Sequence, residues 1–166
     1  MREIKVKQLT YEDFNKYGTF ALMPDESVPH IKVRDRVQFY RDLYHIELGE
    51  EKNMSYSICK IGKREMIIDT MEYHDICEEG LVPLDDDIII FCAPANHTGE
   101  PEPEKVEAFF VPRHTCFTIK AGVWHFSPYV CNVDTGHILV QLPERTYVND
   151  CILKELPEKD HMRIIR

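Results

Sequence analysis

The feature that most constrains this chain is a series of short apolar runs, each bounded by turn-forming residues. The clearest example lies in residues 106–129, where runs at 106–111 and 116–119 flank a turn at Pro112. Short runs rich in Val, Ile, Phe and Thr, bounded by Pro or Gly, are typical of β-strands. We therefore predict that the two runs pair as a β-hairpin, after which Gly122 allows a sharp bend.

Similar runs recur along most of the chain. They lie at residues 4–9, 39–48, 54–61, 66–74, 81–84, 88–93 and 137–142. The run at 88–93 is continuously apolar, as expected of a strand buried on both faces, whereas the run at 54–61 alternates and is expected to be half-buried. Many short strands with little helix predict an all-β sandwich or barrel, with a tail from residue 143 onward that crosses back over the body.

A single short helix is predicted at residues 10–17. Thr10 is a suitable N-cap, and Glu12 and Asp13 follow in the first turn, where carboxylates favour the positive end of the helix dipole. Gly18 is expected to end this helix. Residues 94–105 are rich in Pro and in acidic side chains, and we expect them to form a surface loop.

Composition limits both the organisation of the chain and its partners. With 166 residues, of which 43% are hydrophobic and 30% charged, the chain is expected to form one domain over residues 1–166. The formal net charge of −9 makes nucleic acid and anionic membranes poor partners, because phosphate binding requires clustered Lys and Arg. No apolar run is long enough to span a bilayer. We expect a small-molecule ligand instead.

The cysteines and the first residues indicate the compartment. The N-terminal residues lack the apolar segment of a signal peptide. The six cysteines are scattered without a CxxC pair, so reduced thiols are expected rather than a disulfide framework. These observations predict a cytoplasmic protein.

Two histidines and two glutamates form the candidate functional site. Glu72 and His74 are two residues apart and share one face of a strand, while the turn that follows can return Glu79 to them. His125 comes directly after Trp124, just past the bend at Gly122, so we place Trp124 at the rim of the site. Each residue taken alone could be structural; their combination favours a shared site.

This residue set is chemically suited to two kinds of site. Imidazoles and carboxylates bind divalent first-row metals, so Glu72, His74, Glu79 and His125 could hold Zn, Mn, Ni or Fe. The same residues could instead act as a metal-free acid/base set, because His titrates near neutrality and a carboxylate orients the ring. The sequence leaves both possibilities open.

The spacing of these residues resembles the two motifs of the cupin superfamily. The first motif reads His-x-His-x3–4-Glu, where this chain has Glu72, His74 and Glu79. The second motif ends in Gly-x-x-His, which Gly122 and His125 match. The resemblance implies a cupin-type jelly-roll barrel, a double-stranded β-helix, with one or two short helices.

A further resemblance covers most of the chain. The opening IKVKQLTYEDFNKYG, the segment YRDL at 40–43, the block MEYH…LVPL at 71–84, the segments EAF and GVWH at 107–125, and NDC at 149–151 are similar to the ureidoglycolate lyase family. That family splits ureidoglycolate into glyoxylate and urea, a reaction of purine catabolism, in a pocket inside a cupin barrel. Its members typically form homodimers.

The resemblance implies roles for individual residues. His74 and His125 would transfer protons as catalytic residues, and Glu79 would orient one ring or hold a metal. Lys60 would bind the substrate carboxylate, with Glu72 and Trp124 as further substrate contacts.

The chain also departs from the family pattern. Glu79 stands where the family has Gln, Phe126 where it has a second His, Lys60 where it has Arg, and Tyr73 where it has the Arg of its E-R-H block. A Lys cannot hold a carboxylate bidentately as an Arg does. The alternative function is therefore a cupin of different activity, either a metal-dependent sugar or small-acid isomerase or a non-catalytic protein that binds a small ligand.

Overall fold

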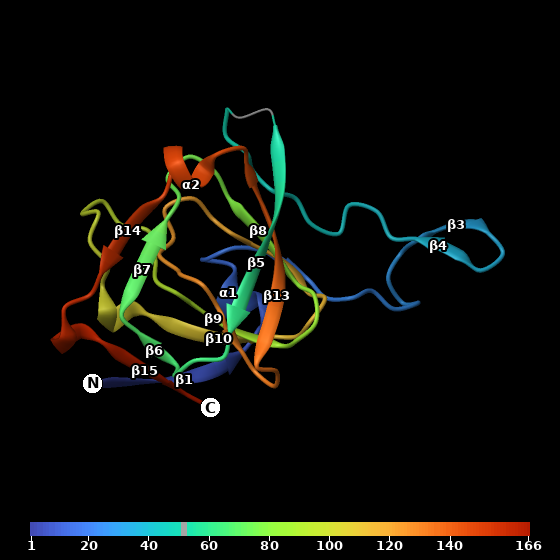
Figure 1. Cartoon of the computed structure of the whole chain (residues 1–166). Coiled ribbons are helices and arrows are strands. Elements are labelled where there is room, and N and C mark those ends of the chain that lie inside the picture. Colours follow the sequence, from blue (N-terminus) through green and yellow to red (C-terminus); the bar gives the residue numbers. More distant parts are fainter. Residues whose placement is uncertain (51–52) are drawn as a thin grey trace.

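The structure is a computed structural model that describes residues 1–50 and 53–166. Most of this part of the chain is strand, with two short α-helices, α1 (Tyr11–Phe14) and α2 (Thr146–Asn149), and two 3-10 turns, η1 (Pro103–Lys105) and η2 (Glu158–Asp160). Two large sheets curl around a common core, and one hairpin stands apart on the right of Figure 1. The predicted all-β class, a cupin-type jelly roll with one or two short helices, is confirmed.

The first sheet has six strands. Their order across the sheet is β12 (Tyr129–Val130), β9 (Ile88–Cys92), β10 (Glu107–Val111), β1 (Arg2–Gln8), β15 (Met162–Ile165) and β6 (Ile67–Ile68). β1 runs parallel to both of its neighbours, and the other pairs are antiparallel. All five residues of β9 are buried, which confirms the prediction that this apolar run is covered on both faces.

The second sheet has five antiparallel strands. Their order is β2 (Phe20–Ala21), β11 (Cys116–Ile119), β8 (Glu79–Pro83), β13 (Thr135–Pro143) and β5 (Met54–Gly62). Two two-stranded antiparallel sheets complete the described structure: β7 (Thr70–Tyr73) with β14 (Ile152–Glu155), which are distant in sequence, and the hairpin of β3 (Ile31–Arg34) with β4 (Val37–Phe39). From β8 to β13 the chain passes repeatedly between the two large sheets, as a jelly roll does.

The core lies where the inner faces of the two large sheets meet. Phe109 of β10 and Phe117 of β11 both pack edge-on against Phe14 of α1, with ring centroids 5.4 and 6.4 Å away. All three rings are fully buried. Burial of one such ring contributes about 2–3 kcal/mol. Phe14 therefore holds the single turn of α1 firmly against both sheets.

The predicted hairpin over residues 106–119 is wrong. β10 pairs with β9, and β11 pairs with β8 and β2, so the two runs belong to different sheets. The turn at Pro112 carries the chain over the edge of the barrel, where the backbone N–H of His114, a residue at φ +65°, donates to the carbonyl of Pro83. The apolar faces of the two strands therefore oppose each other across the core.

Other boundaries also differ from the prediction. Thr10 is the N-cap and accepts a hydrogen bond from the backbone N–H of Asp13 at 3.3 Å, but α1 ends at Phe14. The predicted strand at 66–74 is interrupted at Asp69, and its halves β6 and β7 join different sheets. The tail is more than a crossing segment, because it supplies α2 and two paired strands, β14 and β15.

The segment 39–48, which was predicted to be a strand, contains strand only at Phe39, the last residue of β4. It lies instead across the outer face of the five-stranded sheet. The hydroxyl of Tyr44 donates to the side-chain oxygen of Gln141 on β13 at 2.5 Å, and Ile46 packs on Gly80 of β8. The rest of this segment is therefore held by side chains packed on the face of the five-stranded sheet, and it does not pair with a strand.

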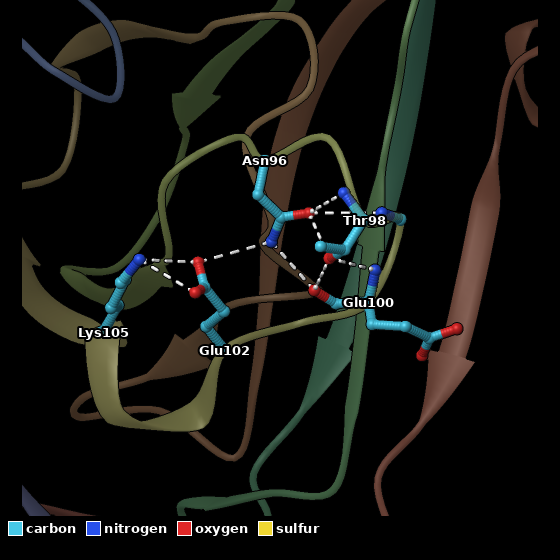
Figure 2. A network of polar contacts seen from close by, with 6 residues as sticks. Asn96, Thr98, Glu100, Glu102 and Lys105 are labelled. Carbon is cyan, nitrogen blue, oxygen red and sulfur yellow. Dashed lines mark hydrogen bonds and ion pairs between the residues drawn. The ribbon is translucent and has the colours of Figure 1, made fainter.

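Residues 94–105 form a surface loop, as predicted, that is held by its own polar groups. Figure 2 shows Asn96 at its centre, where its side-chain oxygen accepts from the backbone and hydroxyl of Thr98 at 3.1 and 2.8 Å. Lys105 pairs with Glu102 at 2.8 Å. Lys154 of β14 contacts Glu100 at 2.5 Å and ties the loop to the body.

Candidate active site

A cavity of about 90 Å³ lies between the two large sheets, with room for roughly three water molecules. Most of its wall is apolar, and its ionisable side chains are Cys59, Glu72, Glu79 and His125. The other lining residues are Leu81, Ile90, Phe91, Ile119, Phe126, Ser127, Pro128, Ile138 and Val140. No Lys or Arg lines this cavity among the described residues.

Backbone pairing brings the two motif segments together. Glu72 on β7 and His125 form an isolated antiparallel bridge, with N–H to carbonyl distances of 2.6 and 2.8 Å. Just before His125, Gly122 adopts φ +75° and its N–H donates to the carbonyl of His74 at 2.6 Å. The bend predicted at Gly122 is therefore present, and it sets the register that places His125 opposite Glu72.

Each of the two histidines is held by one ring nitrogen. His74 Nδ1 lies 2.6 Å from the carbonyl of Asp150, and His125 Nδ1 lies 2.8 Å from the carbonyl of Val123. Because a carbonyl only accepts, Nδ1 carries the proton in both rings, and a neutral ring presents a lone pair at Nε2. This arrangement is typical of metal-binding histidines, whose second nitrogen is fixed by a backbone carbonyl or a carboxylate.

Three of the four predicted ligands converge. One ligand atom each from Glu72, His74 and His125 lie within 4.8 Å of one another. The buried Nε2 of His125 has no hydrogen-bond partner among the described residues, which is unusual for a buried polar atom. Two imidazoles and one carboxylate are a ligand set for catalytic Zn or non-haem Fe, so these residues fit a divalent metal.

Glu79 lies outside that group of three but contacts it. Its Oε2 is 3.1 Å from His125 Nε2, within ion-pair distance, although the contact does not have the geometry of a hydrogen bond. Burial raises the pKa of Glu79, but the neighbouring His125 and His74 outweigh burial and lower it overall. Burial likewise lowers the pKa of His125, and Glu79 more than reverses this effect. Each of the two residues therefore favours the charged form of the other.

Two predicted substrate contacts lie away from the cavity. Trp124 is 1% exposed and packs edge-on against Tyr73 at 4.6 Å, so its predicted place at the rim is wrong. Neighbouring residues of an extended chain point to opposite sides, and His125 takes the side that faces the cavity. Lys60 is exposed on the outer face of β5, where it lies opposite His137 in the pairing of β5 with β13, while its neighbour Cys59 lines the cavity. The predicted role of Lys60 as the carboxylate-binding cation has no support in this geometry.

The segment 150–151 contributes to the site in a way that the sequence analysis missed. Cys151 Sγ lies 3.2 Å from Glu72 Oε2, and burial together with Glu72 raises the pKa of this thiol to about 12, so it donates a hydrogen bond. The carboxylate of Asp150 accepts from the N–H groups of Asp75 and Ile76 at 2.8 and 3.0 Å. In the sequence, the NDC segment at 149–151 showed only a family resemblance. Its contact with the site depends on the pairing of β7 with β14, and no local sequence pattern indicates that pairing.

The curled, mainly-β sheets, with Glu72, His74 and His125 brought together beside the cavity, are those of a cupin-type protein. The sequence matches the family model for ureidoglycolate lyase over residues 1–162. The chain therefore belongs to the ureidoglycolate lyase family.

Three solved structures that resemble this chain are a dTDP-4-dehydrorhamnose 3,5-epimerase and two RmlC proteins. A dTDP-4-dehydrorhamnose 3,5-epimerase from Elizabethkingia anophelis NUHP1 has a TM-score of 0.47 and 11% identity over 90% of this chain and 92% of that chain. RmlC from Streptococcus suis, with dTDP-D-xylose, has a TM-score of 0.37 and 12% identity over 76% and 70%. RmlC from Legionella pneumophila Philadelphia 1 has a TM-score of 0.42 and 12% identity over 62% of this chain and 54% of that chain, about half of its length.

The comparison with curated proteins found no match. In the part of the chain that the structure describes, no helix has the length and apolar character needed to cross a membrane.

Proposed function

We propose that this protein is a carbon–nitrogen lyase that cleaves ureidoglycolate, a small ureido α-hydroxy acid, into glyoxylate and urea inside the barrel cavity. The observation that carries the proposal is the pair of buried imidazoles with free Nε2 positions beside Glu72, in a chain that matches the ureidoglycolate lyase family over residues 1–162. The family match supplies the reaction, and the geometry supplies groups that can carry it out.

The reaction needs two proton transfers and no second reactant. The hydroxyl group of the substrate loses its proton as the C–N bond breaks, and the departing urea nitrogen gains a proton. His125 takes the hydroxyl proton in this proposal, because Glu79 stabilises the imidazolium that forms. His74, whose ring is fixed through Asp150, protonates the leaving nitrogen.

The substrate carboxylate sets a further requirement. The cavity contains Glu72 and Glu79 and is lined by no Lys or Arg among the described residues, so an anionic ligand would be repelled by the bare site. A divalent ion such as Zn, Mn, Ni or Fe would supply positive charge for a carboxylate and a hydroxyl oxygen. Glu72, His74 and His125 would hold this ion, and Cys151 would fix the orientation of Glu72. With an ion bound, the Nε2 atoms of both rings would be its ligands, so the proton transfers given above to the two histidines describe the metal-free site.

Several coarser expectations belong to the same proposal. Residues 1–166 act as one domain in the cytoplasm, in purine catabolism, and as a homodimer. Light scattering tests the homodimer and assay of cell fractions tests the cytoplasmic location, both without reference to the chemistry.

The second candidate is a metal-binding cupin of different activity, a sugar or small-acid isomerase, or a non-catalytic protein that binds a small ligand. The specific observation in its favour is that the cavity lacks a cationic side chain, together with Glu79 and Phe126 where the family has Gln and His. Metal retained by purified protein that releases no urea from ureidoglycolate would favour this candidate.

The rate of urea release from ureidoglycolate, compared between variants, tests which residues form the site. His125→Ala should lower the rate by roughly 10²–10⁴-fold, the contribution of a positioned acid or base. Lys60→Ala is the matched control, since Lys60 lies on the outer face of β5, and it should leave the rate unchanged. Equal losses in both variants, or none in His125→Ala, would contradict the proposed site.

A further inference from the structure

The residue near the cavity that most needs an explanation is Arg64, in the turn between β5 and β6. Its guanidinium donates to the backbone carbonyls of Ser127 and Pro128 at 2.7 and 2.9 Å, and it lies 4.2 Å from the centre of the Tyr129 ring. Carbonyls and an aromatic face orient an arginine without neutralising it. The ion pairs among the described residues do not include Arg64, so its positive charge is held in place and not compensated.

The segment that Arg64 holds is a wall of the cavity. Phe126, Ser127 and Pro128 all line the cavity. Phe126 also lines a surface groove of about 390 Å³, together with Arg64 and Tyr129. The groove and the cavity therefore adjoin at Phe126, which is half-buried.

The charge of Arg64 extends to the cavity side of this wall. Burial raises the pKa of the Cys59 thiol, which lines the cavity. A hydrogen bond with Ser127 and the positive charge of Arg64 both oppose this rise. Arg64 therefore acts on a group inside the cavity, although it lines the groove and not the cavity itself.

Arg64 also keeps hydrogen-bond donors for a ligand. A guanidinium has five N–H groups, and the two carbonyls use two of those of Arg64, so three have no partner among the described residues. Two carboxylates line the same groove, Glu65 and Asp69, and both are exposed. Solvent screens their repulsion of an anion, whereas an anion in direct contact with Arg64 gains charge-assisted hydrogen bonds.

The substrate of the proposed reaction needs both the space and the charge that lie here. The cavity has room for roughly three water molecules, whereas ureidoglycolate has about nine non-hydrogen atoms. Its carboxylate also needs a cation, and Lys60, which stands where the family has Arg, lies on the outer face of β5.

We propose that ureidoglycolate extends from the cavity past Phe126 into the groove, with its ureido and hydroxyl groups in the cavity and its carboxylate bound by Arg64. Rotation of the Phe126 side chain joins the two spaces, and the fork of Arg64 receives the carboxylate through two hydrogen bonds. Arg64 thereby takes the role that Lys60 cannot fill. The identity of the ligand rests on the lyase function proposed above, whereas recognition of a small carboxylate by Arg64 does not.

Steady-state kinetics of urea release test Arg64 against its neighbour in the chain. Arg64→Gln should raise the KM for ureidoglycolate at least about tenfold and change kcat by less than about threefold, because the ground state and the transition state share the carboxylate contact. Arg64→Lys keeps the charge without the fork and should have an intermediate KM. Lys63→Gln is the matched control, since Lys63 is exposed and lines neither the cavity nor the groove, and it should leave both values unchanged.

Binding of glycolate separates recognition of the carboxylate from turnover. Glycolate keeps the hydroxyl and carboxylate groups of the substrate without the ureido group, and glycolamide is its uncharged counterpart. In calorimetric titrations, wild-type protein and Lys63→Gln should prefer glycolate to glycolamide by at least about tenfold, and Arg64→Gln should lose this preference. An arginine that only holds the wall in place would weaken both ligands equally when it is replaced.

The two measurements separate failure of this inference from failure of the lyase proposal. Urea release by the wild-type protein, with the same KM in Arg64→Gln and Lys63→Gln, would overturn the role of Arg64 and leave the lyase intact. No urea release, with a preference for glycolate that depends on Arg64, would overturn the lyase and support the carboxylate site. No preference for glycolate in the wild-type protein, or equal losses for both ligands in Arg64→Gln, would overturn the inference.

The near-ultraviolet circular dichroism of the single tryptophan, Trp124, which is buried, verifies that each variant is folded. If Arg64→Gln does not fold, Arg64→Lys takes its place, and a KM and a glycolate affinity equal to those of the wild-type protein would then overturn the inference.

Discussion

At the scale of single residues, the affinity of the site for a metal depends on which side chains can reach the same ion. Glu72, His74 and His125 do so, whereas Glu79 lies outside this group of three, although its Oε2 is 3.1 Å from His125 Nε2. Glu72→Gln or His125→Ala should therefore weaken Zn binding by at least about 100-fold, while Glu79→Gln should change it by less than about tenfold. Calorimetric titration of the chelator-treated protein with Zn measures this difference. Tight binding by Glu72→Gln, or its loss in Glu79→Gln, would contradict the three-ligand assignment.

A second residue, Glu107, links stability to pH. Burial raises the pKa of Glu107, but hydrogen bonds from Lys16, Lys7 and Tyr17 outweigh it and lower the pKa from 4.5 to about 2. A carboxyl with a depressed pKa contributes stability that is complete above pH 4.5 and is lost as the pH falls from 4.5 toward 2. Because Lys7 and Lys16 are about half exposed, solvent screens much of this contribution.

Glu107→Gln should accordingly lower the free energy of unfolding at pH 7 by about 1–2 kcal/mol and have less effect at pH 2. Urea unfolding at the two pH values provides the comparison. A loss of equal size at both would mean that the carboxylate charge is not the source of the stability.

At the scale of elements, the strands were predictable where their pattern is local. The continuous run of β9 indicates its burial from sequence alone, and Thr10 marks the start of α1. The alternation of β5 was misleading, because its apolar Tyr56 and Ile58 are exposed whereas Cys59 and Ile61 face inward. Pairing partners were not predictable, because β10 and β11 look like a hairpin in sequence and differ from one only through contacts with β8 and β9. The site shows the same division: spacing indicated Glu72, His74 and His125, whereas Cys151 reaches Glu72 only through the pairing of β7 with β14.

The approach of α1 to β11 gives a prediction at this scale. Gly18 faces the backbone of Thr118 so closely that a Cβ would lie 1.8 Å from its carbonyl oxygen. Gly18→Ala should therefore lower the free energy of unfolding by more than about 2 kcal/mol, since backbone rather than a flexible side chain must move. The matched control is Gly62→Ala, where a Cβ meets nothing within 4 Å and the change should stay within about 1 kcal/mol. Similar melting temperatures for both variants would argue against this packing.

At the scale of the whole molecule, the barrel holds a cavity lined by Glu72, Glu79 and His125, with His74 next to it, and the β3–β4 hairpin extends from the barrel. The fold class followed from strand number and spacing. Lys60 and Trp124 were misplaced because a shift of one residue along a strand decides which side chain faces the cavity.

The lyase reaction is the central claim, and product stoichiometry tests it most directly. Carbon-13 spectra of labelled ureidoglycolate with metal-loaded protein should show glyoxylate and urea forming in equal amounts. The His125→Ala variant should form these products only at the background rate. Glyoxylate accompanied by ammonia and carbon dioxide instead of urea, or substrate unchanged beyond the background rate, would contradict the account.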